Sequence, residues 1–375
     1  MEEERATINR ERLVNSFREL VAIDSPSLKE RNMADELTRR LLALGFSVRE
    51  DNAGSRIGGN SGNLFATLRG GDALPPLLFC AHMDTVQPAR SKRAILENDG
   101  TIHSAGDTVL GADDVSAISA ILEAVQSLQE QRLLKRDIEV LFSVSEETYG
   151  TGAAVFDCSV IRSKEAYVPD YDGAHGQAVV SAPTILAFRA EITGKASHAG
   201  FAPERGVNAI SAAARAVNRL KLGRVSPGLT RNIGTIHGGL LTNIVPDACV
   251  MEGEIRGEKH EKALRLLQQT QKAFQSVCDA FGAGLAFSSK CLVQAYHTPA
   301  DAAVVSRYFR VCKAYGHKTE AVSTFGGSDN NILAQRGISG IVLPSAMHAC
   351  HSGAEYTTVE ELCRLAELLA GLMQT

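Results

Sequence analysis

The chain has 375 residues, of which 44% are hydrophobic and 22% are charged, enough for a sizeable core and for two domains. Its net charge of −4 and isoelectric point near 6.2 argue against a nucleic-acid-binding protein. No apolar run reaches the roughly 18 residues needed to span a bilayer, and the charged start Met1–Arg5 lacks a signal peptide's apolar centre, so we expect a cytoplasmic protein without membrane contact.

The first segment expected to carry chemistry is the apolar run Leu77–Phe79, which is typical of a buried parallel strand. His82 and Asp84 follow it two residues apart, beyond the strand's carboxyl end, where open α/β sheets bind ligands. Their side chains point the same way on an extended chain. This favours a metal ligand with the carboxylate that orients it, or two ligands, with a structural histidine as the alternative.

A helix is predicted after Gly111, because apolar residues recur at helical spacing from Val115 to Leu128. Asp113 and Asp114 therefore stand at its N-terminus. One aspartate would suffice to cap the helix and to interact with its dipole. The second is more than a cap needs, and a carboxylate at this position could bridge two metal ions.

The strand-like run Ile138–Val144 is followed by two adjacent glutamates, Glu146 and Glu147. Packing alone explains such a pair poorly, because carboxylates are rarely buried unless they are paired or bind a metal. Adjacent side chains also point in different directions. This suits one glutamate as a ligand and the other as a general base.

Two later segments end in comparable side chains. A short β-like segment ends at Asp170, with Asp172 as a rival two residues on, and the run Ile338–Leu343 precedes His348 and His351, for which a surface loop is the alternative. Oxygen and imidazole groups at five element ends, without a thiolate cluster, suit zinc, cobalt or manganese. We expect a hydrolytic site with two divalent ions roughly 3.5–4 Å apart.

The eight cysteines are scattered, and none forms a Cys-x-x-Cys pair. This predicts buried, reduced thiols rather than disulfides or a zinc ribbon. Cys350 stands next to His351, and we interpret it as a small packing residue.

In the middle of the chain, strand-like and helix-like patterns alternate in the order βαββαβ. The segments are Thr184–Ile192, Val207–Leu220, Asn232–His237, Ala248–Ile255, Ala263–Phe281 and Leu285–Val293. This order predicts a ferredoxin-like α+β domain inserted into an α/β domain with a mixed, mostly parallel sheet. We expect the α/β domain to comprise residues 1–180 and 296–375, and the inserted domain to comprise residues 181–295.

Six motifs occur in a fixed order between residues 81 and 356. They are Ala81–Val86, Leu110–Asp114, Glu146–Glu147, Gly194–Gly200, Asn243–Asp247 and His351–Tyr356. With them the chain resembles the dinuclear zinc peptidases that include peptidase T, carboxypeptidase G and aminoacylase, and it is most similar to peptidase T-like proteins. Val115 departs from the lysine that relatives often carry, at a position not expected to bind metal.

The resemblance implies a ligand set for two ions, zinc or else cobalt or manganese. His82 and Asp170 would bind one ion, Glu147 and His351 would bind the other, and Asp113 would bridge them. The β-like segment before Asp170 matches the family pattern, which favours it over its rival. The glutamate–tyrosine pair after His351 anchors the match at that histidine.

The resemblance also implies roles beside the ligands. Asp84 would orient the imidazole of His82, and Glu146 would be the general base and acid that acts on the water between the ions. Relatives carry a cis peptide bond after the bridging aspartate, so we expect one between Asp113 and Asp114.

Four residues of the chain's second half complete the expected site. By sequence alone His198 is a polar loop histidine, but the resemblance implies that it reaches the partner subunit's site and stabilises the oxyanion. Asn243 and Arg256 match lid positions that hold substrate, with a surface salt bridge as the alternative for Arg256. The backbone around Gly327 could face the substrate, with a plain turn as the alternative.

The resemblance therefore implies a homodimer, joined through the inserted lid and dimerisation domain, that hydrolyses amide bonds of short peptides. The most similar relatives favour an aminopeptidase acting on tripeptides. A carboxypeptidase or N-acyl-amino-acid deacylase on the same scaffold stays open. A non-catalytic metal-binding dimer is the alternative of another class, and Glu146 argues against it because a binding protein has no use for a general base.

Overall fold

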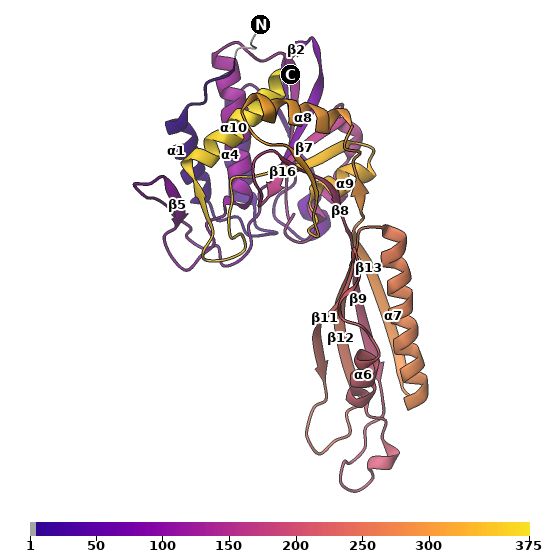
Figure 1. Cartoon of the computed structure of the whole chain (residues 1–375). Coiled ribbons are helices and arrows are strands. Elements are labelled where there is room, and N and C mark those ends of the chain that lie inside the picture. Colours follow the sequence, from indigo (N-terminus) through magenta and orange to yellow (C-terminus); the bar gives the residue numbers. More distant parts are fainter. Residues whose placement is uncertain (1–4) are drawn as a thin grey trace. The chain divides into compact units, whose positions relative to one another are not determined.

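The computed structural model describes residues 5–375 and is shown in Figure 1. The first four residues, on which the expectation of no signal peptide partly depends, lie outside the described residues. The chain forms two compact units. The main unit comprises the described residues up to Ser181 together with His297–Thr324 and Ser328–Thr375, and the inserted unit comprises Ala182–Tyr296 and Phe325–Gly327.

Within the described residues, the large sheet of the main unit has nine strands. They are β1 (Ser47–Glu50), β2 (Leu64–Asp72), β3 (Leu74–His82), β6 (Arg136–Ser143), β7 (Glu165–Tyr171), β8 (Gln177–Ala182), β14 (Tyr296–His297), β15 (Glu320–Ser323) and β16 (Ser339–Pro344). The order is β1-β2-β6-β3-β7-β16-β8-β14, with β15 beside β8. β6, β3, β7 and β16 are mutually parallel, whereas β1–β2, β2–β6 and β16–β8 are antiparallel. The predicted mixed, mostly parallel sheet is confirmed.

Helices cover both faces of this sheet (Figure 1). They are α1 (Arg10–Val21), α2 (Arg31–Ala43), α3 (Ala53–Ile57), α4 (Ala112–Glu130), α5 (Thr151–Val155), α8 (Ala303–Ala314), α9 (Asp329–Gln335) and α10 (Val359–Gln374), with a 3₁₀ turn at Cys158–Val160. Along β3, Leu77 and Phe79 join one apolar cluster while Leu78 and Cys80 join another. Burial on both faces explains why the central strands are continuously apolar.

A small second sheet of the main unit has the order β17-β5-β4. Its strands are β4 (Ala94–Leu96), β5 (Thr101–Ser104) and β17 (Tyr356–Thr358). This sheet matters for the site because the loop before β17 carries His351.

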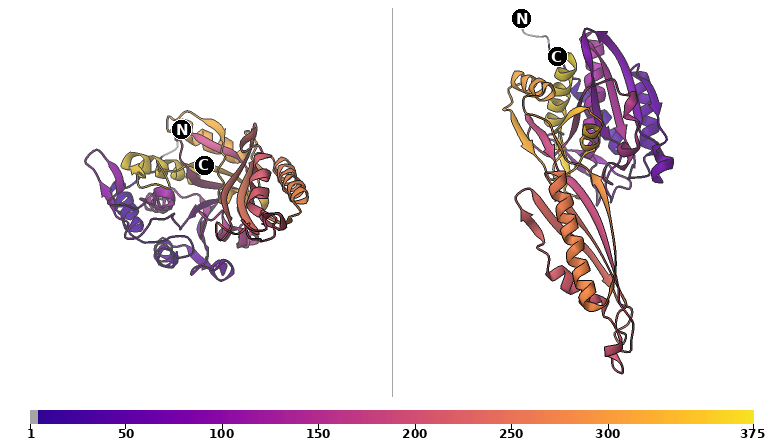
Figure 2. Two further views of the ribbon diagram at one scale, coloured as in Figure 1. Left: turned by 90° about the horizontal axis from the view of Figure 1, so that it is seen from below. Right: turned by 90° about the vertical axis from the view of Figure 1, so that its right-hand side faces the viewer.

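The inserted unit has the predicted βαββαβ order with one additional short strand. Its elements are β9 (Thr184–Thr193), a 3₁₀ turn (Pro203–Arg205), α6 (Ala209–Asn218), β10 (Gly223–Ser226), β11 (Leu229–Gly238), β12 (Ala248–Gly257), α7 (His260–Phe281) and β13 (Gly284–Val293). The antiparallel sheet has the order β10-β11-β12-β9-β13, and α6 and α7 cover one face of it (Figure 2). Along β9, Phe188 and Ala190 are buried, whereas Arg189 and Glu191 are exposed. The alternation of β9 therefore reflects one covered face and one open face.

No helix of the described residues combines the length and the apolar character that a membrane span requires. All eight cysteines are free, as the sequence predicts. The expectation that they are buried is confirmed for Cys80, Cys249, Cys278 and Cys312. It is wrong for the half-buried Cys158, Cys350 and Cys363 and for Cys291, which is exposed on the edge strand β13.

Candidate metal centre

The parallel pairing of β3, β6, β7 and β16 brings their carboxyl ends to the same edge of the sheet. The register places His82, the last residue of β3, opposite Ser143, the last residue of β6. Asp170 lies near the end of β7. The side chains that the sequence analysis selected at these ends therefore converge.

His82 is buried at the centre of this cluster. Its Nδ1 lies 2.9 Å from the carbonyl oxygen of Asp84 and 3.5 Å from that residue's carboxylate. Its Nε2 lies 2.9 Å from Asp113 Oδ1 and 3.9 Å from Asp170 Oδ1. When Nδ1–H donates to the carbonyl of Asp84, the lone pair of Nε2 is left facing the two aspartates, as a metal ligand requires.

Asp113 faces one histidine with each carboxylate oxygen. Its Oδ1 contacts His82, and its Oδ2 lies 3.2 Å from His351 Nε2. The peptide bond between Asp113 and Asp114 is cis, as expected. Asp114 is turned into the protein, where its carboxylate accepts the backbone N–H of His82 at 3.2 Å. Asp113 alone therefore presents its carboxylate to both histidines, the arrangement of a bridging ligand.

The two glutamates take different positions, as their adjacency predicts. Glu147 groups with His82 and Asp113, and its Oε1 lies 3.0 Å from His351 Nε2 without hydrogen-bond geometry. Glu146 groups with His82 and Asp170. Glu147 Oε1 is a buried oxygen without a hydrogen-bond partner, which a cation would satisfy.

The backbone around the glutamates is held by Asp84. Its carboxylate accepts the N–H of Glu146 at 2.9 Å and that of Glu147 at 3.2 Å, and it accepts the hydroxyl of Ser27 at 2.6 Å. Ser145, just before the pair, has a φ of 53°. Such left-handed conformations of non-glycine residues occur mainly where the surrounding structure enforces them, often at functional sites. The carboxylate of Asp84 thus holds the glutamates in addition to lying near the imidazole.

The two rival residues lie in a separate group. His348 Nδ1 is 3.4 Å from Asp172 Oδ1, and His348 Nε2 is 2.9 Å from Glu361. Asp170 and His351 contact the other candidate ligands instead. The geometry therefore favours Asp170 and His351, as does the resemblance.

The cluster contains more carboxylates than its two histidines could neutralise. Burial raises the pKa of Asp114, Glu146 and Asp170 well above the usual range, and neighbouring carboxylates add to this effect. Contacts with the carboxylates of Asp113 and Glu147 raise the pKa of His351 to about 10. Without metal, the negative charges of the carboxylates are thus neutralised by bound protons. Divalent cations would neutralise the same charges.

The other pKa shifts follow the same logic. Burial opposes ionisation of His82, but its contacts with Asp113 and Asp84 raise its pKa well above the usual value. Burial would raise the pKa of Asp113, but its hydrogen bonds with His351 and His82 hold that pKa well below the usual range. A metal would have to displace the protons on the two histidines, so its affinity should fall in acid.

The described donors fit two divalent ions. Imidazole nitrogens and carboxylate oxygens surround the site, and the nearby thiol of Cys350, whose pKa is raised by burial, is not part of either candidate ligand group. This donor chemistry suits zinc, cobalt or manganese.

The inserted unit places the other expected residues as follows. His198 is exposed, and its Nδ1 accepts the backbone N–H groups of Gly200 and Phe201 at 3.1 and 3.2 Å. Because Nδ1 accepts, the ring hydrogen of a neutral His198 lies on Nε2, which is a donor. Asn243 is exposed, and its carbonyl accepts the N–H of Ala199 at 3.0 Å.

Arg256 is half-buried and already engaged. Its guanidinium forms two hydrogen bonds with the carboxylate of Glu254, at 2.8 and 3.1 Å, and one with the carbonyl of Phe325 at 2.8 Å. The salt bridge that the sequence left open is therefore present. Gly327 is exposed in the loop before α9, where a Cβ would come within 3.1 Å of Val293.

Three buried carboxylates near the site were missed as functional candidates. Glu30 accepts the N–H and the hydroxyl of Ser145, Asp329 accepts the hydroxyl of Ser143, and Glu355 accepts two backbone N–H groups at the start of α4. Burial raises the pKa of Asp329 to about 6. The sequence contains a signal near two of them: Asp329 follows a glycine-containing loop, and Glu355 belongs to a family motif. Neither signal indicated these contacts.

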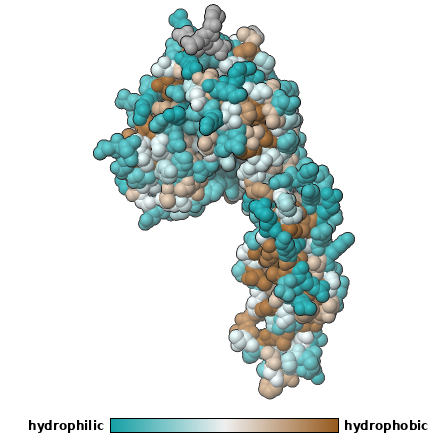
Figure 3. All heavy atoms as spheres, viewed as in Figure 1, coloured by the Kyte–Doolittle hydropathy of each residue, from teal (hydrophilic) through white to brown (hydrophobic). Residues whose placement is uncertain are grey.

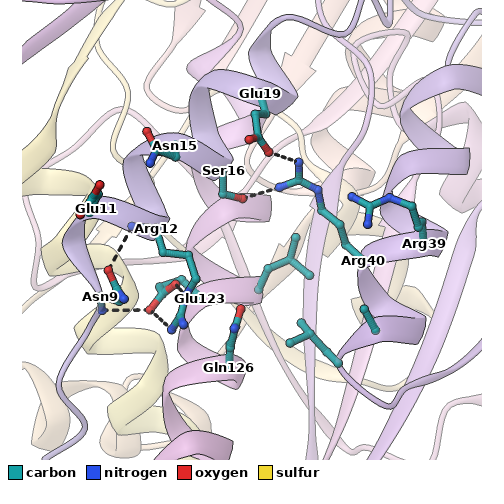
Figure 4. A pocket seen from close by; sticks show the side chains of 13 residues that line it. Asn9, Glu11, Arg12, Asn15, Ser16, Glu19, Arg39, Arg40, Glu123 and Gln126 are labelled. Atoms are coloured by element: carbon teal, nitrogen blue, oxygen red, sulfur yellow. Dashed lines mark hydrogen bonds and ion pairs between the residues drawn. The ribbon is translucent and has the colours of Figure 1, made fainter.

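A separate hollow of about 560 Å³ lies on the main unit between α1, α2 and α4 (Figure 4). Its two central arginines already have partners, since Arg12 contacts Glu123 at 2.7 Å and Arg40 contacts Glu19 at 2.6 Å. None of the predicted site residues lines it. We therefore assign the candidate site to the strand ends and no ligand to this hollow.

Comparisons with known proteins agree with this assignment. The family model of a peptidase dimerisation domain matches residues 180–281, and that of peptidase family M28 matches residues 63–213. Aminopeptidase PepT from Bacillus cereus is 35% identical over 98% of both chains, with a TM-score of 0.91. A tripeptidase from Staphylococcus aureus is 32% identical over 98% of both chains, with a TM-score of 0.95. The protein YqjE of Bacillus subtilis is 34% identical over 98% of this chain and 99% of its own.

Proposed function

The chain belongs to the family of peptidase T-like metallopeptidases, and from this premise we propose that it is a dinuclear aminopeptidase that hydrolyses tripeptides. The observation that carries the proposal is Asp113, whose two oxygens face His82 at 2.9 Å and His351 at 3.2 Å. A carboxylate held between two imidazoles in this way suits one ion on each side.

The ligands divide into two sets that share Asp113. His82 and Asp170 would hold one ion, and Glu147 and His351 would hold the other. We propose zinc, with cobalt or manganese as substitutes, because the donors are imidazoles and carboxylates. When bound, the two ions would lower the pKa of a water between them toward neutrality and polarise the substrate carbonyl.

Glu146 would move the proton in this reaction. It groups with His82 and Asp170, and burial raises the pKa of its carboxyl, which favours uptake of a proton and its later transfer to the leaving amine. The contacts from Asp84 to the backbone of Glu146 and Glu147 would keep the side chains of the base and the ligand pointing in different directions.

The inserted unit supports a homodimer whose sites are shared. β10 pairs only with the first part of β11, Leu229–Arg231, so the rest of β11 forms an open edge of the sheet. The same unit exposes apolar side chains, and Figure 3 shows brown surface on it; among them are Phe201, Ile210, Ile236, Leu240 and Leu241. An open edge beside exposed apolar groups favours association with a second copy.

His198 would serve as the oxyanion donor in the partner's site. The two N–H groups that bond its Nδ1 leave Nε2–H free to donate to a developing negative charge. Asn243, Arg256 and the backbone at Gly327 would contact the substrate. The eight free cysteines suit a reducing compartment, so the proposal includes a cytoplasmic location.

A substrate comparison in defined metal tests this function. The protein is stripped with a chelator, its metal content is measured, and zinc, cobalt or manganese is added back with a free tripeptide, an N-blocked tripeptide and a C-blocked tripeptide. We expect about two ions per chain, cleavage of the free and C-blocked peptides, and no cleavage of the N-blocked one. Cleavage of the N-blocked peptide but not of the C-blocked one would instead identify a carboxypeptidase or deacylase. A firm stoichiometry of one ion would refute the two-metal site.

A further inference from the structure

Helix α4, which presents Asp113, begins without a cap of its own. Its N-cap residue is Gly111, with a φ of 80°, and no side chain of the helix caps it. Asp113 and Asp114 have non-helical backbone angles, so the regular helix begins only after the cis peptide bond and the segment before it must be held by other contacts. The first N–H groups of a helix need acceptors, because no carbonyl precedes them within the helix. An acceptor for this turn must therefore come from elsewhere in the chain.

Glu355, more than 240 residues away in sequence, supplies that acceptor. Its Oε2 accepts the N–H of Gly111 at 2.8 Å, and its Oε1 accepts the N–H of Asp113 at 3.0 Å. Glu355 is 1% exposed. A carboxylate at a helix N-terminus also interacts favourably with the helix dipole, so this contact fixes the backbone of the residue whose side chain faces both histidines.

The same loop carries His351. It is closed at its ends by a two-bond bridge between His348 and Tyr356, with N···O distances of 3.0 and 3.1 Å. The rings of these two residues stack at 4.8 Å. His351, four residues before Glu355, has a φ of 63°, so its orientation depends on the loop around it.

The turn at Gly111 is confined from its other side by a buried lysine. Lys92 is 1% exposed, and its Nζ donates to Thr85 Oγ1 at 3.1 Å. A Cβ added at Gly111 would come within 3.1 Å of that Nζ. Lys92 also interacts electrostatically with Glu355, whose pKa is raised by burial.

We propose that Glu355 is a positioning residue that holds Asp113 and His351 in a common frame, so that the ion bound by His351 and Glu147 depends on it more than the other ion does. The proposal rests on the proposed function for the ligand assignment. Partners of metal ligands are typically worth about 10–100-fold in metal affinity. Glu355 acts through the backbone of Asp113 and through its own loop, and does not touch the metal.

The test is metal binding by Glu355→Gln. Zn²⁺ is titrated into chelator-treated protein, and binding is measured by titration calorimetry. The amide keeps one acceptor oxygen, but its NH₂ group meets the second N–H, so one of the two contacts is lost. We expect one ion to bind roughly 10–100-fold more weakly while the other keeps its affinity and the circular dichroism spectrum is unchanged. Wild-type affinity for both ions would overturn the proposal, as would an equal loss for both.

A matched control is available within the main unit. Glu139 is also fully buried, and its carboxylate also accepts two backbone N–H groups, from Arg162 and Ser163, but it lies four residues before the strand end. Glu139→Gln should leave both affinities unchanged. If it weakens one ion as Glu355→Gln does, the effect is a general result of removing a buried charge and the proposal fails.

Two further measurements complete the design. If Glu355→Gln does not fold, Glu355→Asp is titrated in the same way. The shorter side chain should still weaken the binding of one ion selectively. Wild-type affinity for both ions, or an equal loss for both, would again overturn the proposal. The wild-type protein is assayed for peptide hydrolysis separately. Two bound ions without hydrolysis would refute the proposed function and leave the role of Glu355 standing.

Discussion

The two units of this protein treat charged and apolar side chains in opposite ways. In the main unit, Asp84, Asp114 and Glu355 are buried beside the strand ends. In the inserted unit, the ion pairs of Arg189 lie exposed on the open face of the sheet. Phe201 and Leu240 of that unit are each 87% exposed.

The contrast separates two kinds of function. A buried carboxylate costs free energy unless hydrogen bonds or a cation compensate for it, so a cluster of them marks a place where a cation binds. Exposed ion pairs cost little and contribute little. Exposed apolar side chains mark a surface that another molecule covers. The main unit thus has the chemistry of a metal centre, and the inserted unit has the surface of an interface.

The largest effect is expected at the buried pair Glu146 and Glu147. Glu146→Ala should lower turnover of a tripeptide by roughly 10²–10⁴-fold or more, because a general acid–base group is lost, while most of the metal is retained. Glu147→Ala should lose metal as well, because its carboxylate is a proposed ligand. Turnover and elemental analysis of both variants check this. Equal metal loss in the two would show that the roles of the pair are misassigned.

A nearly as large effect is expected from the inserted unit, at His198. Removing an oxyanion donor costs roughly 10²–10³-fold in turnover, so His198→Ala should be almost inactive while it binds two ions. Mixing this variant with Glu146→Ala under subunit exchange should restore activity, because each heterodimer has one site with both wild-type residues. The same mixture without exchange is the control. A mixture that stays inactive after confirmed exchange would place His198 outside the partner's site.

The pH dependence of stability should reveal the buried charge beside Glu355. Burial lowers the pKa of Lys92 from 10.5 to about 8, so between these values the unfolded chain binds more protons than the folded chain. The free energy of unfolding should therefore gain up to about 3 kcal/mol from this group as pH rises from 8 to 10.5. Below pH 8 the gain is absent.

Lys92→Met removes this titration and should flatten that part of the profile relative to wild type. Chemical denaturation between pH 7 and pH 10.5 measures the difference. Lys290→Met, an exposed lysine of the inserted unit, is the control. Parallel profiles for wild type and Lys92→Met would contradict the prediction.

The sequence predicts those site residues that stand next to a recognisable pattern. His82, Glu146 and Glu147 come just after apolar runs, and parallel strands bring such ends together. The βαββαβ order of the inserted unit could be predicted because its strands alternate and its helices are amphipathic. The additional strand β10 is only four residues long and gives no periodic signal.

The residues that hold the ligands could not be predicted in the same way. Glu30 reaches Ser145 across 115 positions, and Glu355 reaches Asp113 across 242. Both bind backbone N–H groups, which every residue except proline offers, so the partner's identity leaves no trace in the sequence. Sequence patterns therefore selected the candidate ligands, while the contacts that orient them required the three-dimensional structure.

The smallest effect is expected at the exposed ion pairs of the inserted unit. Arg189 and Glu252 are direct neighbours on β9 and β12, with a distance of 2.7 Å between Nη1 and Oε1. In a double-mutant cycle with Arg189→Ala and Glu252→Ala, followed by chemical denaturation, we expect the effects of the single variants to add within error, because water screens an exposed pair. A clear coupling that persists in 1 M salt would contradict this, since at that concentration exposed charges are screened within roughly 3 Å. It would mean that the open face of this sheet is covered in the assembled protein, and that the interface of the inserted unit extends beyond the edge of β11 and its exposed apolar side chains.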